Sequence, residues 1–205
     1  MTLTVTNLSF ERQFITVFSQ LNFTLAPGEL LQIRGENGSG KSTLLRILAG
    51  FIDAPPSTIQ WNYQCITDCL AEYQQQLHYI GHQNGIKHHL TVYENILFYS
   101  ALGNASTTDY SSILTKMGIA KRLHTPAHDL SAGQLRRLSL ARLVLSERPL
   151  WILDEPLSAL DQSGQFILGN LLNEHLAAKG MAIVATHHDL PLALSSLKTL
   201  TLERA

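Results

Sequence analysis

The chain has 205 residues, which suits one domain, or one domain with a subdomain, and is long enough to bury a real core. It carries 15 basic and 16 acidic residues and a formal net charge of -1, so composition offers no electrostatic case for binding nucleic acid. The two cysteines, Cys65 and Cys69, support neither a disulfide framework nor a four-ligand zinc site, and we expect free thiols in a reducing cytoplasm.

The beginning of the chain, residues 1–7, lacks the basic and then apolar pattern of a signal peptide. No continuous apolar stretch approaches the roughly 18 residues that a membrane-spanning helix requires. We therefore expect a cytoplasmic protein that does not itself span a membrane.

The first predicted elements are β-strands. Residues 3–10 and 18–25 alternate apolar and polar side chains, and a turn at Pro27 and Gly28 separates them from a short strand at residues 29–34. After a loop at residues 35–42, apolar residues at helical spacing predict a helix over 42–49 that stops at Gly50, a candidate C-cap.

The loop between this strand and helix matches the phosphate-binding pattern G-x-x-x-x-G-K-[ST], although an ordinary glycine-rich turn is an alternative. Glycines are needed there because several backbone N–H groups must turn inward onto one anion. Lys41 would reach the β- and γ-phosphates, Ser42 would offer its hydroxyl to Mg²⁺, and the helix would point its positive end at the same phosphates. The predicted nucleotide contacts are Gly35, Glu36, Asn37, Gly38, Ser39, Gly40, Lys41, Ser42 and Thr43.

The rest of the chain predicts a small hairpin, a helical insertion and two buried strands. Residues 53–57 break the structure, residues 58–61 and 63–66 fit a hairpin, and residues 77–83 fit a strand. From Thr91 to about residue 148 the pattern is helical, with Thr91 and Glu94 placed as a capping box. The apolar runs 150–153 and 181–185, separated by another helix, are typical of central parallel strands.

Two carboxylates, Asp154 and Glu155, follow the first of these runs. They lie at the carboxyl end of a buried strand, which is the edge where α/β sheets bind ligands. Phosphoryl transfer needs one group that holds hydrated Mg²⁺ and another that orients the attacking water. We assign Asp154 to the metal and Glu155 to the general base, with a charged loop after a strand as the alternative.

Residues 130–134, Leu-Ser-Ala-Gly-Gln, open a further helix, and the helix N-terminus forms a second candidate anion site. A plain helix cap is the alternative, because Ser131 is also a good capping residue. The pentapeptide resembles the signature sequence of ATP-binding cassette (ABC) ATPases and stands between the two nucleotide motifs in the order that this family uses. The resemblance implies that Ser131, Gly133 and Gln134 contact the γ-phosphate of ATP bound by the opposite subunit of a dimer.

Three further positions are assigned by the same resemblance. Gln83 is similar to the glutamine that senses Mg²⁺ and attacking water. Residues 158–161 resemble the loop that crosses the dimer interface. His187 resembles the switch histidine that contacts the γ-phosphate, and the adjacent His188 is the alternative.

The adenine contact departs from the family pattern. Where the family commonly has a stacking aromatic residue, this chain has Arg12, with Phe10 and Phe14 nearby. A guanidinium plane can also stack on a base, although a solvent-exposed arginine explains the residue equally well. The spacing of the other histidines matches no known metal ligand set. They are His78, His82, His88 and His89.

The resemblance implies a fold of the α/β class: a P-loop NTPase core with a parallel sheet, an N-terminal antiparallel β-subdomain and an inserted α-helical subdomain. It implies a single ABC ATP-binding domain over residues 1–205, with the core in residues 1–84 and 149–205 and the helical subdomain, which carries the signature motif, in residues 85–148.

Among ABC proteins the chain is most similar to the ATP-binding subunit of the bacterial cytochrome c maturation system, described as a haem exporter ATPase. This likeness rests on residues 80–87, 130–143 and 150–156. It implies ATP and Mg²⁺ as cofactors, a second copy and integral membrane subunits as partners, and a peripheral place on the cytoplasmic face of the inner membrane. We expect residues 84–94 to contact the membrane subunits, with an ordinary solvated loop as the alternative. Other readings are another ABC exporter, a soluble ABC ATPase of translation or repair, and a nucleotide-binding module without hydrolysis.

Overall fold

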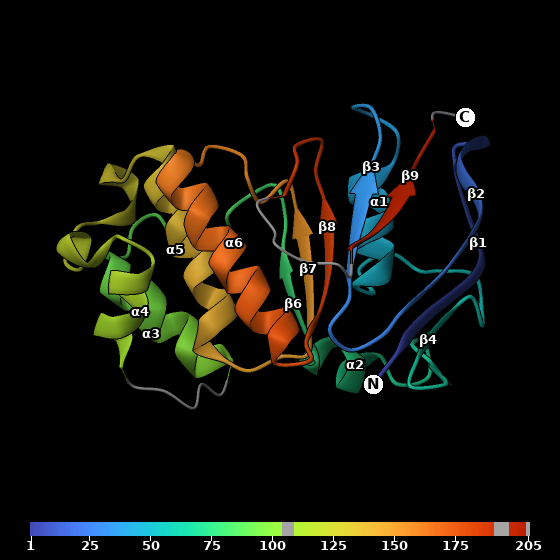
Figure 1. The fold of residues 1–205 in the computed structure, drawn as a ribbon, viewed down its shortest axis with the longest axis horizontal. Coiled ribbons are helices and arrows are strands. Elements are labelled where there is room, and N and C mark those ends of the chain that lie inside the picture. Colours follow the sequence, from blue (N-terminus) through green and yellow to red (C-terminus); the bar gives the residue numbers. More distant parts are fainter. Residues whose placement is uncertain (104–108, 191–196, 204–205) are drawn as a thin grey trace.

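The computed structural model describes residues 1–103, 109–190 and 197–203, and its elements are arranged around a five-stranded parallel sheet (Figure 1). The strand order is β6-β7-β8-β3-β9, and each neighbouring pair is parallel. The strands are β3 (Leu30–Arg34), β6 (Leu77–Ile80), β7 (Leu150–Asp154), β8 (Met181–Ala185) and β9 (Leu197–Thr201). All residues of β7 and β8 are buried, which explains their continuous apolar sequences.

The two faces of this sheet belong to two separate hydrophobic cores. Along β7, Leu150 and Ile152 face a core shared with α1 (Lys41–Leu48), and Trp151 and Leu153 face a core shared with α5 (Ala132–Leu145) and α6 (Gln162–Ala177). Figure 1 shows α5 and α6 on one side of the sheet and α1 on the other. Because all five strands are parallel, their carboxyl ends lie together at one edge of the sheet, between the two helical layers.

A second sheet is antiparallel, has the order β2-β1-β4-β5, and packs beyond α1 (Figure 1). The predicted strands 3–10 and 18–25 are confirmed as a longer hairpin of β1 (Leu3–Arg12) and β2 (Ile15–Leu25), whose turn contains Gln13 and Phe14 with positive φ. The small hairpin is confirmed as β4 (Ile59–Trp61) and β5 (Gln64–Cys65).

In the described part of residues 85–148, all the regular elements are helices or helical turns, joined by loops. They are α3 (Val92–Leu102), α4 (Tyr110–Lys116), two short 3₁₀ turns (Ala120–Arg122 and Ala127–Asp129) and α5. The predicted capping box of Thr91 and Glu94 is present at the start of α3. None of the helices in the described residues is both long and apolar enough to cross a membrane.

Some predicted boundaries were wrong. β6 ends at Ile80, because residues 81–83 leave the sheet and line a cavity instead. The C-cap of α1 is Ala49, and Gly50 follows it in a left-handed conformation with φ of 71°. The helix α2 (Leu70–Gln75) and the edge strand β9 were not predicted, because both are short and largely exposed.

Candidate functional site

The loop of residues 35–42 runs from β3 into the first turn of α1. Gly35 and Gly40 have φ angles of 152° and 94°, which residues with side chains rarely adopt. A Cβ on Gly35 would lie 2.5 Å from the Leu202 carbonyl oxygen, and a Cβ on Gly40 would lie 2.5 Å from Cγ1 of Val17. Glycine is therefore required at both positions, because the loop is packed between the end of β9 and the β1–β2 hairpin.

Two polar groups of this loop face inward. Lys41 is only 7% exposed, and its Nζ donates hydrogen bonds to the carbonyl oxygens of Gly35 and Glu36 at 2.8 and 2.9 Å. The Ser39 hydroxyl is buried and has no hydrogen-bond partner among the described residues. A cation held inside the loop and an unsatisfied hydroxyl beside it fit an anionic phosphate. Of the remaining predicted contacts, Asn37 is exposed at the tip of the loop and Thr43 lies in the first turn of α1.

Asp154 ends β7 and is 3% exposed. Burial raises the pKa of its carboxyl group, and a hydrogen bond from the Ser42 side chain partly opposes this effect. Ser42, in the first turn of α1, and Asp154, at the end of β7, therefore lie in contact. A hydroxyl and a single buried carboxylate suit Mg²⁺, which keeps several waters and phosphate oxygens among its ligands.

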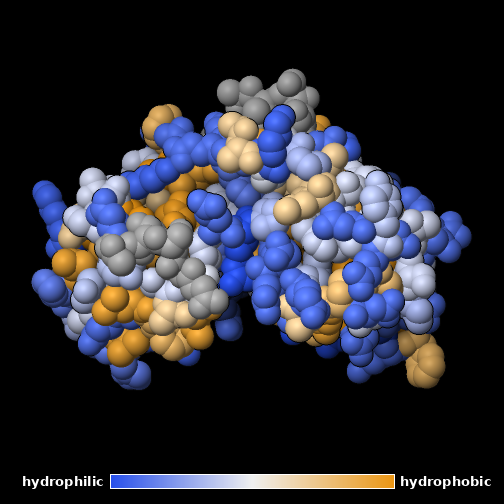
Figure 2. Space-filling view, turned by 90° about the horizontal axis from the view of Figure 1, so that it is seen from below, coloured by the Kyte–Doolittle hydropathy of each residue, from blue (hydrophilic) through white to orange (hydrophobic). Residues whose placement is uncertain are grey.

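Gln83 lies after β6 and lines the same cavity as Ser42 and Asp154. This cavity has a volume of about 760 Å³ and extends along β6 to α3. The three residues predicted to hold the metal thus lie around one space. Figure 2, seen toward the amino ends of the parallel strands, shows a hydrophilic hollow between the two lobes of the molecule.

Glu155 and His187 come from neighbouring strands and touch. The Nδ1 atom of His187 lies 3.2 Å from Oε1 of Glu155, whose side chain is 17% exposed. Glu155 has φ of 45°, a left-handed conformation that is uncommon for a residue with a side chain. Its backbone N–H donates to the Ala185 carbonyl at the end of β8, which ties the two strand ends together.

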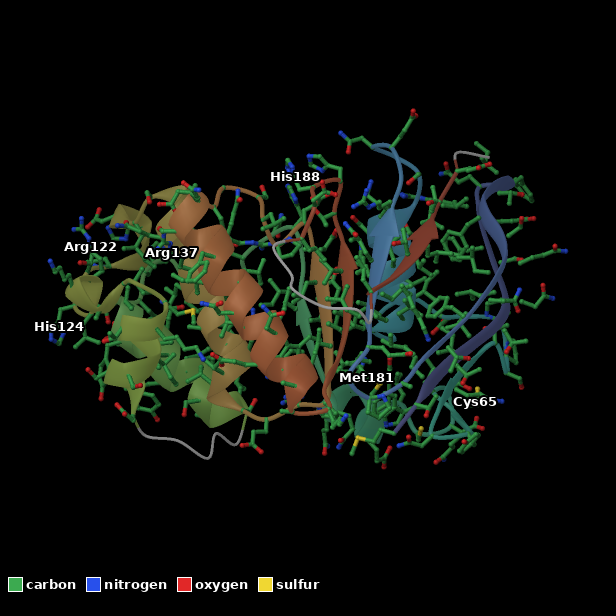
Figure 3. The ribbon with its side chains drawn as sticks, in the orientation of Figure 1. Cys65, Arg122, His124, Arg137, Met181 and His188 are labelled. Carbon is green, nitrogen blue, oxygen red and sulfur yellow. The ribbon has the colours of Figure 1, made fainter. Side chains whose placement is uncertain are left out.

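The contact with Glu155 favours His187 over His188 for the switch position. The two imidazole rings lie 3.8 Å apart, but His188 is held through its backbone, whose carbonyl accepts a hydrogen bond from the buried Gln32 side chain at 3.0 Å. Figure 3 shows His188 beyond the carboxyl end of β8, at the same edge of the sheet.

The signature segment forms the start of α5. Ser131 is the N-cap, and its Oγ accepts from the Gln134 N–H while the Gln134 side chain accepts from the Ser131 N–H. A Cβ on Gly133 would lie 2.8 Å from the Ala159 carbonyl oxygen, so this helix start packs tightly on the loop of residues 158–161. In the described residues no hydrogen bond joins residues 131–134 to residues 35–43.

Arg12 lies at the end of β1, exposed, beside the turn of the hairpin. Of the two aromatic residues near it, Phe10 stacks on Phe18, whereas Phe14 is fully exposed. Val17 of the same hairpin touches the phosphate loop, but no hydrogen bond joins Arg12 to this loop in the part of the chain that is described. The adenine contact therefore stays a prediction.

The cysteines are free thiols, as predicted, and Cys65 lies far from the carboxyl edge of the parallel sheet (Figure 3). Within the described ranges, no group of three or more His, Cys, Asp or Glu residues could hold a metal ion. His78 bonds through Nε2 to the Ser146 carbonyl, and His88 bonds through its own carbonyl to the His128 backbone N–H.

Sequence reasoning missed two arginines of α5 that reach toward the site. Arg137, labelled in Figure 3, forms an ion pair with Asp161, the N-cap of α6. Arg136 is buried and donates to the backbone carbonyls of Asp154 and Glu155, and to that of Gly81, close to Gln83. The only signal in the sequence was a pair of adjacent arginines within a helical segment, which is more typical of a solvent-exposed surface.

Comparisons with known proteins agree with this geometry. The ABC transporter family matches residues 18–158. A cytochrome c biogenesis ATP-binding export protein CcmA of Vibrio vulnificus (strain YJ016) is 43% identical over 92% of this chain and 93% of its own length. The corresponding protein of Aliivibrio fischeri is 41% identical over 98% of both chains. The solved structure of cbiO1 from Clostridium perfringens, part of the ABC transporter complex cbiONQ, is 26% identical, covers 92% of this chain and 80% of that one, and has a TM-score of 0.75. The chain therefore belongs to the ABC transporter family, as an ATP-binding subunit.

Proposed function

We propose that the chain is the ATP-hydrolysing subunit of an exporter that acts in cytochrome c biogenesis, on the cytoplasmic face of the inner membrane. The observation that carries the hydrolytic part is the contact between Glu155 and His187 beside the buried Asp154. The similarity to proteins named as cytochrome c biogenesis ATP-binding export proteins supports the cellular role over another exporter or a soluble ATPase of translation or repair.

ATP would occupy the loop of residues 35–42, where Lys41 would exchange its two carbonyl contacts for the β- and γ-phosphates. Ser42, Gln83 and Asp154 would hold Mg²⁺. When bound, the ion would neutralise charge on the phosphates during transfer.

Glu155 would act as the general base. Its carboxylate would take a proton from water as the water oxygen bonds to the γ-phosphorus and the bond to the β-phosphate oxygen breaks, with ADP as the leaving group. His187 would hold the carboxylate through Nδ1 and reach the γ-phosphate from the end of β8.

The signature segment would complete the site of a second copy. The Ser131 hydroxyl accepts a hydrogen bond from Gln134, so its own proton remains free to be donated to a γ-phosphate. Gly133 lets the start of α5 pack on the Ala159 carbonyl, which fixes the direction of the backbone N–H groups that would face the phosphate. Because no hydrogen bond in the described residues joins this segment to the phosphate loop of the same chain, the proposal places ATP between two copies.

The cavity beside Gln83 is our candidate surface for the membrane subunits. Basic and aromatic side chains line it, and Asp154 is the only acidic side chain among its described lining residues. Those lining residues include Arg46, Phe51, Tyr79, Tyr99 and Arg142. An amphipathic segment of a membrane subunit with acidic and apolar side chains would complement this surface.

Residues 84–94 at the rim of this surface are held in a fixed shape. The fully buried Asn95 donates to the carbonyls of Lys87, Leu90 and Thr91 and accepts from the Lys87 N–H. Because Asn95 already orders the backbone of this loop, the exposed side chains of the loop can contact a partner without a further entropy cost for ordering it.

The decisive experiment uses Glu155→Gln. This variant should bind ATP with unchanged affinity but stall hydrolysis, and light scattering with saturating ATP and Mg²⁺ should show a dimer. Glu72→Gln on the exposed side of α2 is the matched control and should turn over ATP like the wild type. A Glu155→Gln variant that stays monomeric with ATP bound would count against the dimer.

The cellular role needs a separate measurement. Cells that lack this chain should lose covalently haem-stained c-type cytochromes, and the wild-type chain should restore them while Lys41→Ala should not. Purification in mild detergent should retain integral membrane subunits. Recovery of ribosomes instead, with normal cytochromes in the deletion strain, would favour the soluble alternative.

A further inference from the structure

Arg136 is a buried positive charge in the second turn of α5, with only 2% of its surface exposed. Its Nη2 donates to the carbonyl oxygens of Asp154 and Glu155, both at 2.8 Å, and its Nε donates to the Pro156 carbonyl at 3.3 Å. One side chain of the signature helix thus bonds to three consecutive backbone carbonyls of the carboxylate segment.

The other branch of the same guanidinium bonds to the segment that carries Gln83. The Nη1 atom of Arg136 donates to the Gly81 carbonyl at 3.0 Å and to Oδ1 of Asn84 at 3.1 Å. These two acceptors flank Gln83 in the sequence. Arg136 therefore bridges the two segments from which the proposed metal and water contacts arise.

A buried guanidinium needs all of these acceptors, because an uncompensated charge in the interior is strongly destabilising. Burial lowers the pKa of Arg136, while the nearby charges of Asp154 and Glu155 raise it. The acceptors of Arg136 are backbone and amide oxygens, so the arginine does not occupy the carboxylate oxygens of Asp154 and Glu155, which contact Ser42 and His187 instead.

The bond to Glu155 also holds an unfavourable backbone conformation. Glu155 has φ of 45°, and its carbonyl and N–H groups are fixed by Arg136 and by Ala185. Without these bonds the residue would relax toward negative φ, and its side chain would turn away from His187.

We propose that Arg136 is a positioning residue for ATP hydrolysis: it holds Asp154 and Glu155 in register with the segment around Gln83. The inference rests on the proposed function, because it assigns those residues to metal binding and base catalysis. A displacement of residues 81–84 would move the guanidinium and with it the carbonyl of the general base. A lysine would keep the charge but lose the planar fork that spans both segments.

Arg136→Lys tests the proposal. We expect kcat for ATP to fall at least about tenfold while KM stays within about threefold, because a small misplacement of a reacting group costs turnover more than substrate binding. The assay is run at a temperature where circular dichroism shows the variant to be fully folded, so that lost stability does not lower the rate.

Arg148→Lys is the matched control. Arg148 donates through Nη1 to the carbonyls of Gln74, Gln75 and Leu77, at the opposite end of β6 from the catalytic segment. Its substitution should lower the melting temperature and leave kcat within about twofold of the wild type, since no reacting group changes place.

A second readout needs no turnover. The affinity of the ATP-bound chain for Mn²⁺, measured from the EPR signal of free Mn²⁺, should fall at least about threefold in Arg136→Lys, because Asp154 loses its fixed position. If the wild-type chain hydrolysed no ATP, the proposed function would fail, while this measurement would still decide the role of Arg136.

Unchanged kcat and unchanged Mn²⁺ affinity in the folded variant would overturn the proposal, and so would a raised KM with unchanged kcat. If Arg136→Lys does not fold, Asn84→Ala removes one acceptor and keeps the arginine. Its kcat should fall about threefold at constant KM, and wild-type kcat in that variant would also overturn the proposal.

Discussion

At the scale of single residues, the hydrogen bonds of Lys41 determine which contacts must break when ATP binds. Its ammonium group is already satisfied by the Gly35 and Glu36 carbonyls, so the phosphates must replace two existing hydrogen bonds. A doubly charged phosphate is a stronger acceptor than two neutral carbonyls, which makes the exchange favourable.

Lys41→Ala should lower ATP affinity and turnover together. We expect at least about a tenfold loss of affinity, because one charge-assisted contact to the phosphates disappears. Titration with a fluorescent ATP analogue and a steady-state ATPase assay measure the two effects. Lys116→Ala, which removes an exposed ion pair with Glu174 on the helical side, is the control and should leave both values unchanged. Wild-type ATPase activity in Lys41→Ala would contradict the assignment of the loop.

The paired histidines allow a second test at this scale. His187→Ala should lower kcat about a hundredfold, because it removes the contact to Glu155 and the donor that we propose for the γ-phosphate. His188→Ala should lower it less than about threefold, since its backbone bond to Gln32 survives the change. Single-turnover ATPase rates separate the two variants, and equal losses would show that the contact with Glu155 does not identify the switch residue.

The sequence predicted those site residues that belong to short local patterns. Lys41 follows a glycine-rich loop, and Asp154 and Glu155 follow an apolar run, so neighbours along the chain define them. Arg136 could not be found in this way, because its partners lie at residues 81–84 and 154–156. Only the packing of α5 against two strand ends gives this arginine a role.

At the scale of elements, the side chain of Asn95 links α3 to the preceding loop through hydrogen bonds. The side chain is fully buried, donates to three carbonyls and accepts one N–H. The loop has no regular structure, so these bonds replace those that a helix or strand would supply.

Asn95→Leu should destabilise the protein by about 3 kcal/mol, because buried carbonyls lose their donors. Urea unfolding followed by circular dichroism measures the free energy of unfolding. The control is Asn22→Ala, an exposed asparagine that accepts from the Asn7 N–H and donates to the Gln20 carbonyl, for which we expect a cost of about 0.5 kcal/mol because water can replace both bonds. A cost for Asn95→Leu no larger than that of the control would mean that water replaces these bonds.

The sequence predicts an element best where the whole segment is buried. β7 and β8 are buried along their full length, and their uniform apolar sequences revealed them. β9 is exposed at four of its five residues, so no burial pattern distinguished it from a loop. Its existence depends on pairing with β3, which is a property of the sheet and not of the segment.

At the scale of the whole molecule, His78 joins the helical side to the parallel sheet. It lies on β6, and its Nε2 donates to the carbonyl of Ser146, the residue that ends α5. Burial lowers the pKa of His78 to about 4, the bond to Ser146 opposes this, and the charges of Arg148, Arg142 and His175 lower it further. The folded protein therefore holds this imidazole neutral.

The sign of the pH effect follows from this lowered pKa. The contribution of neutral His78 to the free energy of unfolding is fully present above pH 6.5 and is lost as the pH falls toward about 4. In this interval the unfolded chain binds a proton at His78, whereas the folded chain does not. We expect a loss of about 3 kcal/mol over this interval. His78→Gln, which keeps a donor for Ser146, should lose less stability in urea unfolding at pH 4.5 than the wild type. His128→Gln, at an exposed position, should follow the wild-type curve, and identical curves for all three proteins would contradict the prediction.

The position of β3 in the parallel sheet ties nucleotide binding to the timing of protein synthesis. β3 and the phosphate loop lie within the first 42 residues, but the two neighbours of β3 are β8 and β9, at residues 181–185 and 197–201. The backbone that packs against Gly35 belongs to Leu202, later still. Until these segments have left the ribosome, both edges of β3 lack a partner and the loop lacks one of its walls. We therefore expect a nascent chain to bind no ATP and to need protection by chaperones, so that no partly made subunit can compete for a place in the transporter.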